Sequence, residues 1–219
     1  MAKKIFVALL LVTLAAGGAF AQFQLSAGAG GNFAVSWESI EMSQGGFTIE
    51  GLLTTTGGGF YAFFDATYVE ADIGMLFGSQ KMKTSLAGAS AETDGPKVSF
   101  LTLALYGKYP IDLGGAALFP MLGFQYDIGL SAKQEVDGTT YEADSEDLPD
   151  ALNKFWIKFG VGADLNILEK LYLRPSFLYG FNFGTKDNRD AVKTAKDSGT
   201  DVSTFYHGLD IRVAVGFKF

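Results

Sequence analysis

The 219-residue sequence contains no cysteine, five prolines and a single histidine, His207. The lack of cysteine excludes disulfides, thiolate metal sites and cysteine nucleophiles. One histidine cannot form a multi-histidine metal centre. No apolar run reaches the roughly 20 residues that a membrane-spanning helix needs. The formal net charge is −7, and an acidic chain is repelled by phosphates, so nucleic acid is not an expected partner.

What the chain has in quantity is glycine, with 28 residues, and aromatic side chains, at 14%. Together with few prolines, this composition favours many strands and tight turns over helices. Two lysines near the N-terminus precede an apolar run, Ile5 to Ala16, and an Ala-x-Ala site ends at Ala21. This is the pattern of a cleaved secretory signal peptide. A membrane anchor would need a longer run. We therefore expect residues 1–21 to be removed and residues 22–219 to form the mature domain.

Alternation of apolar and polar residues is the strongest pattern in the chain. From Phe205 to Phe219 the odd positions are apolar apart from His207, while the even positions carry Tyr, Gly, Asp, Arg, Ala, Gly and Lys. Successive side chains of a strand point to opposite faces, so this segment predicts a strand with one apolar face. Seven earlier segments alternate in the same way: 23–38, 58–66, 69–78, 98–109, 116–130, 155–165 and 171–183. The sequence therefore predicts eight strands.

The predicted connections alternate in length. Short ones lie at 67–68, 110–115 and 166–170, and long polar ones lie at 39–57, 79–97, 131–153 and 185–203. Outer-membrane barrels have short periplasmic turns at one rim and long extracellular loops at the other. The even number of strands places both ends of the barrel chain on the periplasmic side. The first long loop leaves room for an extra hairpin above the membrane.

The apolar face could point inward around a ligand, as in a soluble eight-stranded lipocalin, or outward to lipid. The interior of an eight-stranded barrel is just wide enough for side chains to fill. Many of the apolar residues are Phe or Tyr, and this set would overfill such a space. The glycine-rich face with scattered charges fits it better. We predict an all-β fold, a closed antiparallel eight-stranded transmembrane β-barrel, whose closure leaves no sheet edge in the hydrocarbon.

The last strand carries the most specific likeness to a known class of protein. Val213, Val215, Phe217 and Phe219 alternate toward a terminal aromatic residue. In this pattern the mature chain resembles small bacterial outer-membrane barrels of the OmpA membrane-domain, OmpX and OmpW type. The resemblance implies location in the bacterial outer membrane and contact with outer-membrane lipid. It also implies biogenesis through periplasmic chaperones and the barrel-assembly machinery, which reads the C-terminal aromatic strand.

Charged side chains of both signs fall on the face predicted to point inward. Buried charges are tolerated when they are paired and hydrogen-bonded. An ion-selective lining needs a ring of one sign, so this mixture favours a plug of ion pairs over a pore. Asp65 lies beside Glu70 and therefore needs a cation from across the lumen, such as Arg212 or Lys218. The predicted lumen network is Asp65, Glu70, Asp72, Lys108, Asp127, Lys158, Asp164, Arg174, Asp210, Arg212 and Lys218.

Strand neighbours predict particular pairs within this lumen network. The hairpin that turns at 166–170 places Asp164 opposite Arg174 on the inner face. The third and fourth predicted strands bring Glu70 and Asp72 toward Lys108. Both pairings follow from the period of two in an antiparallel hairpin.

No group of residues has the spacing of a known active site or metal site. Ser203, His207 and Asp201 are the residue types of a hydrolase triad, but their spacing does not favour catalysis. The acidic loop at 133–150 lacks the DxDxDG spacing of a calcium loop. We expect no enzyme activity, no cofactor and no metal. The predicted function is a structural or surface-interaction barrel whose extracellular loops contact a ligand or a host surface. The alternative is a narrow porin-like channel for small solutes, including hydrophobic ones.

Overall fold

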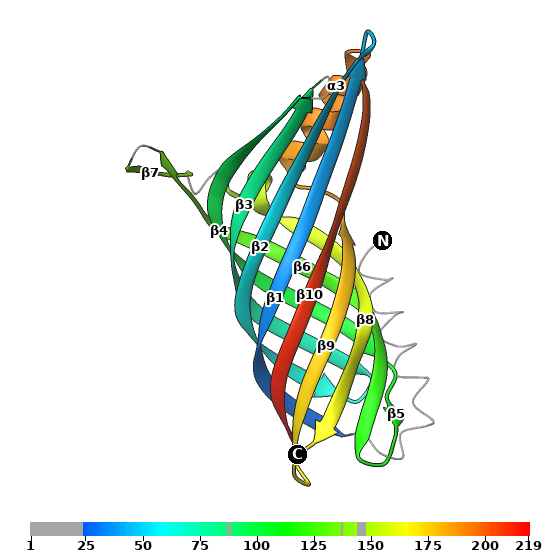
Figure 1. Ribbon diagram of the computed structural model, residues 1–219. Coiled ribbons are helices and arrows are strands. Elements are labelled where there is room, and N and C mark those ends of the chain that lie inside the picture. Colours follow the sequence, from blue (N-terminus) through cyan, green and yellow to red (C-terminus); the bar gives the residue numbers. More distant parts are fainter. Residues whose placement is uncertain (1–23, 87–88, 137, 144–147) are drawn as a thin grey trace, which may run out of the picture.

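A computed structural model describes residues 24–86, 89–136, 138–143 and 148–219, so the predicted signal peptide lies outside the described residues. Figure 1 shows a tall barrel of tilted strands with a helix near one end. The strands are β1 (Leu25–Gln44), β2 (Phe47–Ala66), β3 (Val69–Leu86), β4 (Ala89–Lys108), β5 (Ile111–Asp112), β6 (Ala116–Val136), β7 (Thr139–Glu142), β8 (Lys154–Asn166), β9 (Leu171–Asn182) and β10 (Asp201–Lys218). The described helices are α2 (Leu148–Leu152) and α3 (Lys186–Asp197).

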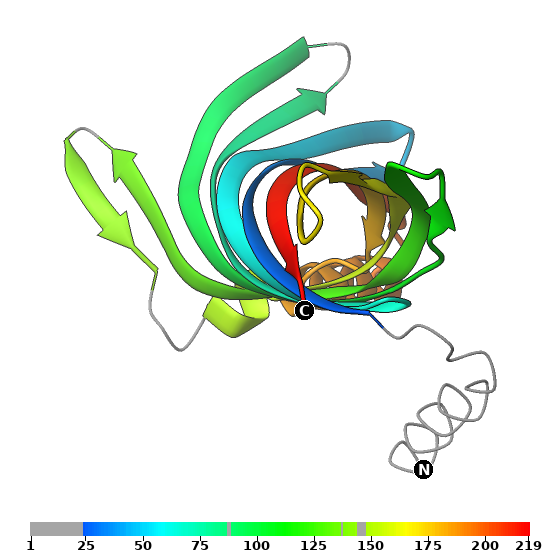
Figure 2. The ribbon, with the colours of Figure 1, turned by 90° about the horizontal axis from the view of Figure 1, so that it is seen from below.

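Eight of these strands close into a ring in the order β1-β2-β3-β4-β6-β8-β9-β10. Every pairing in the ring is antiparallel, and β10 returns to β1 over a register that runs from Ser26–Lys218 to Ser43–Asp201. Figure 2 shows these strands arranged around one axis. The predicted closed, antiparallel, eight-stranded barrel is confirmed. We call the end with the short turns at 67–68, 110–115 and 166–170 the turn end, and the opposite end the loop end.

Two of the predicted long loops are strand rather than loop. Residues 39–57 belong to β1 and β2, which are joined by a tight turn at Gly45 and Gly46, where φ is +59° and +85°. Residues 79–97 belong mostly to β3 and β4 in the same way. The prediction was wrong because most outward positions of these segments, such as Ser39, Glu41 and Lys83, are polar. A polar outer face is acceptable for a strand that extends beyond an apolar layer into water. The extra hairpin allowed in the first loop is therefore the continuation of β1 and β2.

The other two predicted loops contain short elements. In the third, β7 pairs with the end of β6, and α2 precedes β8. In the fourth, the Thr185 side chain accepts a hydrogen bond from the Asn188 N–H at 3.2 Å and caps the start of α3. The sequence did not predict α3, because the helix buries no residue and has no apolar stripe to indicate it. Within the described ranges, no helix is long and apolar enough to cross a membrane.

The outer face of the barrel is apolar and the inner face is polar, as predicted. On β2, Phe60 is 60% exposed while its neighbour Tyr61 is 6% exposed. On β6, Leu122 is 61% exposed while Met121 is 5% exposed. The same parity holds along the last strand, where Ile211 and Val213 are exposed and Arg212 is buried. The hydrophobic side chains therefore cover the exterior, and the charged side chains line the interior.

Aromatic rings fill the space that the inward glycines leave. A Cβ added to Gly216 would lie 2.1 Å from the ring of Tyr172, and one added to Gly162 would lie 2.4 Å from the ring of Phe119. Tyr172 and Phe119 are both fully buried. They fill much of the bore, as expected for eight strands.

Candidate functional site

The turn-end half of the lumen is organised around Arg174 on β9, which is 1% exposed. Its Nε donates to Asp164 Oδ1 at 2.6 Å, and Nη2 donates to Asp164 Oδ2 at 2.7 Å. Nη2 also donates to Asp65 Oδ2 at 2.5 Å, and Nη1 donates to Glu70. Lys108 pairs with Asp65 and lies 4.0 Å from Glu70. One guanidinium therefore joins strands from opposite sides of the ring.

Aromatic rings surround this guanidinium. Arg174 Cζ lies 4.6 Å from the ring centre of Phe63, 5.0 Å from that of Tyr172 and 5.1 Å from that of Phe119. Rings at these distances attract a cation through their electron-rich faces and keep water away from it. The cluster of Arg174, its three carboxylates and these rings forms a first barrier across the lumen.

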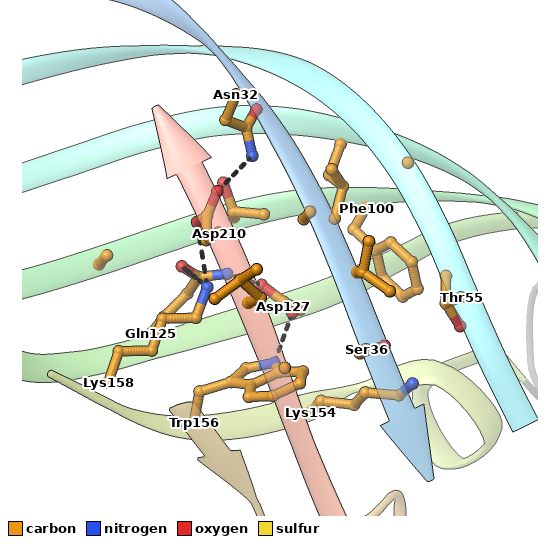
Figure 3. Close-up of a pocket in the computed structure, with 18 of the residues that line it drawn as sticks. Asn32, Ser36, Thr55, Phe100, Gln125, Asp127, Lys154, Trp156, Lys158 and Asp210 are labelled. Carbon is orange, nitrogen blue, oxygen red and sulfur yellow. Dashed lines mark hydrogen bonds and ion pairs between the residues drawn. The ribbon is translucent and has the colours of Figure 1, made fainter. Parts of the chain in front are cut away.

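A second barrier is built around Arg212 on β10. Its Nη1 donates to Asp72 Oδ2 at 2.7 Å, and its Nε donates to Asp210 Oδ2 at 2.9 Å. Asp210 also accepts from Lys158 Nζ at 3.2 Å and from Asn32 Nδ2 at 3.2 Å. Figure 3 shows Asn32 and Lys158 meeting Asp210 from different strands. This layer joins β1, β3, β8 and β10 across the bore.

Asp127 on β6 differs from the other lumen carboxylates, because it forms no ion pair among the described residues. Its Oδ2 accepts from Trp156 Nε1 at 2.6 Å, and its Oδ1 accepts from Gln125 Nε2 at 2.6 Å (Figure 3). Asp127 borders a cavity of about 50 Å³ between the polar side chains of the lumen. A space of this size holds a few water molecules but no larger solute.

A further buried ion pair and α2 lie toward the loop end of the lumen. Glu38 on β1 pairs with Lys154 on β8, and both side chains are buried. Leu148 and Leu152 of α2 pack in a hydrophobic cluster with Val98 and Phe100 of β4.

Outside the bore, α2 and α3 are joined by an exposed ion pair. Lys186 Nζ of α3 lies 2.5 Å from Asp150 Oδ2 of α2. The hydrogen bond to Asp150, together with its negative charge, raises the pKa of the Lys186 ammonium above its usual value. The bridge links the two short elements at the loop end.

The structure places nine of the eleven predicted lumen residues in ion pairs, and the exceptions are Asp127 and Lys218. Lys218 Nζ instead donates to Asn166 Oδ1 at 2.7 Å, at the rim of an open vestibule of about 900 Å³ at the turn end. Arg174 does contact Asp164, and Lys108 lies near Glu70.

Two of the predicted pairings are wrong. The cations of Asp65 are Arg174 and Lys108, rather than Arg212 or Lys218. Asp72 pairs with Arg212, rather than with Lys108. Asp72 differs because the Arg212 side chain reaches across the lumen to a strand that is not its neighbour, and a hairpin register does not describe such a contact. Asp65 takes Arg174 from β9 and Lys108 from β4, because alternation alone does not say which inward cation lies at its level.

Sequence reasoning missed the pair of Glu38 and Lys154 as members of the lumen network. The signal was available. Glu38 is an even position on β1, like the inward Asn32, and Lys154 is an even position on β8, like the inward Lys158. Gln125 and Trp156 were also missed, since neutral side chains carry no charge that would mark them as partners. Both contact Asp127 directly.

The residues of the hypothetical hydrolase triad are not assembled. His207 Nδ1 lies 2.9 Å from the Tyr179 hydroxyl, and its ring stacks on Trp37 at 5.1 Å on the outer face. Ser203 and His207 are four residues apart on one strand, which is about 14 Å at 3.4 Å per residue. A triad needs hydrogen-bond contact between these groups. This site therefore has no triad geometry.

The C-terminal residues of the predicted assembly signal lie on the outer face of β10 and just after it. Val213, Val215, Phe217 and Phe219 are 50%, 46%, 46% and 68% exposed. The rings of Phe217 and Phe219 are 5.8 Å apart at the turn end. They form a continuous apolar strip along the exterior.

No family model and no curated protein matches the chain. Among solved structures, it is similar to the outer membrane protein OprG from Pseudomonas aeruginosa, with 11% identity, 90% of this chain and 96% of that chain covered, and a TM-score of 0.51. Neisserial surface protein A matches with 12% identity and a TM-score of 0.38, and the match covers 88% of this chain and 99% of that chain. A major outer membrane protein from Thermus thermophilus matches with 13% identity and a TM-score of 0.42, and the match covers 86% of this chain and 99% of that chain. The first match shows that the fold is that of a small outer-membrane β-barrel.

Proposed function

We propose that the chain is an integral protein of the bacterial outer membrane, with its turn end in the periplasm and its loop end outside the cell. The apolar exterior supports this, because exposed Phe, Leu, Ile and Val side chains would be unfavourable in water over so large an area. Aromatic pairs at both ends also support it: Tyr68 with Tyr109 at the turn end, 6.4 Å apart, and Phe181 with Phe205 toward the loop end, 5.8 Å apart. Removal of residues 1–21 and recognition of the last strand by the barrel-assembly machinery belong to this proposal.

The lumen of this barrel does not conduct, and the observation that carries this proposal is the pair of cation-centred barriers. Arg174 and Arg212 each bridge carboxylates from several strands, which supports a bore that side chains block at two levels. Glu38 and Lys154 add a third layer under α2. Ions that entered would need to separate buried charge pairs, which is costly.

A closed barrel with extended strands serves as a structural or surface-interaction protein. β1 to β4, β10 and α3 extend at the loop end beyond β8 and β9 (Figure 1). In the extracellular orientation they present hydroxyl and charged side chains to a ligand or a host surface. An enzymatic role gains no support from the side chains described above.

A second candidate function is a narrow conduit for small solutes, including hydrophobic ones. Toward the loop end, β6 pairs with β8 only up to Asp127, and β10 pairs with β9 only from His207. The described residues beyond these points pair with β4, β7 or β1, so the wall there is not continued by β8 and β9. The open vestibule at the turn end also favours this candidate.

Single-channel recordings of the refolded mature protein in planar bilayers test the proposal. We expect no stepwise conductance from the wild-type barrel and none from a variant of an exposed loop-end residue, Lys193→Gln. Reproducible steps in the wild-type protein would favour the conduit instead. Failure of the protein to enter liposomes would overturn the membrane location itself.

A further inference from the structure

The outer face of the barrel carries an ordered change of chemistry on three neighbouring strands. On β3 the outward residues run from Phe77 to Ser79, and on β4 they run from Leu101 through Ser99 to Lys97. On β6 they run from Leu130 through Ser131 to Lys133. In each case an apolar residue is followed toward the loop end by a hydroxyl. On β4 and β6 a lysine comes next. This marks the level at which the apolar band ends.

The strand register places these residues side by side. Ser79 pairs with Lys97, and Lys97 pairs with Lys133, so the two lysines lie directly opposite one another on adjacent strands. In the next row Phe77 pairs with Ser99, and Ser99 pairs with Ser131. Like charges directly opposite each other in a sheet destabilise it. A bound anion between them would remove this cost.

The nearby carboxylates do not neutralise the two lysines fully. Lys97 forms no ion pair among the described residues. Lys133 Nζ lies 3.2 Å from Glu142 Oε1, but the two side chains are 50% and 56% exposed, and such surface pairs contribute little. Lys81 is the next cation along β3, and it pairs with Glu92 at 3.4 Å. The Lys97–Lys133 pair therefore keeps an excess of positive charge.

The same residues line an open groove on the exterior, with a volume of about 440 Å³. Its floor includes the Ser99 and Ser131 hydroxyls, whose oxygens are 2.7 Å apart. One hydroxyl donates to the other, so the second hydrogen stays available to an anion. Phe77 borders the groove on the side of the apolar band. The groove thus offers two ammonium groups and a hydroxyl next to an apolar surface.

We propose that Lys97, Lys133 and the Ser99–Ser131 hydroxyl pair bind the phosphate of an anionic lipid whose acyl chains lie over Phe77 and Leu101. A lysine at the edge of the apolar band extends its ammonium toward the headgroup level, where lipid phosphates lie. A free phosphate ion would gain the charges but not the apolar contact. This site rests on the proposed membrane location and on the outward face of the wall, and it is separate from the lumen.

Lipid binding to the refolded full-length mature protein, measured by native mass spectrometry in detergent, tests the site. The probe is phosphatidic acid, and the reference is diacylglycerol with the same acyl chains. We expect tighter binding of phosphatidic acid, and about 30-fold weaker binding in the Lys97→Gln/Lys133→Gln variant, since each lysine near an anionic lipid contributes about five-fold. The Lys97→Arg/Lys133→Arg variant should keep the binding.

The matched control is Lys193→Gln/Lys196→Gln, which removes two exposed charges from α3 and should bind as the wild type does. Equal affinities in the two double Gln variants would overturn the site. Displacement of the lipid by an equal concentration of inorganic phosphate would overturn the assignment to a lipid. If the wild-type protein does not enter liposomes, the membrane location fails as well, and the two failures are thereby distinguished.

Discussion

Replacing Arg174 with methionine tests whether the lumen charges hold the barrel together. Methionine keeps an unbranched apolar stem, so the change removes the guanidinium and its contacts with the surrounding rings but keeps the packing of the stem. In the native cluster two cations, Arg174 and Lys108, face three carboxylates, Asp65, Glu70 and Asp164. The local formal charge therefore changes from −1 to −2. Asp164 loses its ion partner, while Asp65 and Glu70 keep Lys108.

The expected loss of stability follows from this geometry. Removing one partner of a buried ion pair costs about 3–5 kcal/mol. The Asp164 side chain is 13% exposed, so water can solvate part of the charge that is left, and we expect a loss near the lower limit, about 3 kcal/mol. With a urea m-value of about 2 kcal/mol per M, the unfolding midpoint should fall by about 1.5 M.

The assay is urea unfolding of the barrel folded in lipid vesicles, followed by tryptophan fluorescence and by the heat-dependent shift on a denaturing gel. Lys193→Met is the control, because it removes an exposed charge and should change stability by no more than about 0.5 kcal/mol. Arg174→Lys should fall between the wild type and Arg174→Met. An unchanged midpoint together with a large rise in conductance would refute the reasoning. The charge cluster would then block the bore without stabilising the barrel.

Three further changes probe other parts of the barrel. Gly162→Ala forces a Cβ against a buried inward ring and should cost about 1–3 kcal/mol in the same urea assay, whereas Gly115→Ala, which meets nothing within 4 Å, should not. Phe219→Ala should lower the amount of folded barrel in the outer membrane of cells, measured by the heat-dependent gel shift, while refolding in vitro stays normal. The raised pKa of Lys186 means that its bridge to Asp150 is complete below the pKa of a free lysine and is lost as pH rises through the raised value. Labels on cysteines introduced into α2 and α3 should therefore move apart at strongly alkaline pH, and a constant distance would contradict this.

The sequence predicted the barrel well wherever one strand face had to be apolar. The alternation from Phe205 to Phe219 predicted the strand, the face of it that points inward, and the inward charges Asp210 and Arg212. Burial of one face in lipid imposes this period of two. The same reasoning failed for residues 39–57 and 79–97. There the outward positions are mostly polar, so the apolar outer face that marks the other strands is missing, while hydrogen bonding between neighbouring strands continues.

The partners of the lumen charges were predicted less completely than their positions. Parity places Asp65 and Arg174 inside, but it does not say that a guanidinium on β9 reaches a carboxylate on β2. Such contacts depend on the diameter of the ring and on side-chain length. Asp127 shows the same limit, since its partners are the neutral donors Gln125 and Trp156, which a search for opposite charges passes over.

The proposed lumen barrier and the proposed lipid site lie on opposite faces of the same wall, and this makes them independent in experiment. Val98 packs inward in the cluster that contains α2, while its neighbour Lys97 points outward to the groove. A substitution at Lys97 therefore removes a charge from the exterior without changing any pair inside the bore, and Arg174→Met does the reverse. The Lys97 substitution should therefore weaken lipid binding and leave the stability unchanged. Arg174→Met should lower the stability and leave lipid binding unchanged. A closed wall requires both results. If both properties changed together in either variant, the two faces would be coupled through the strand backbone, and the barrel would be a less rigid body than the antiparallel pairing of β4 with β6 implies.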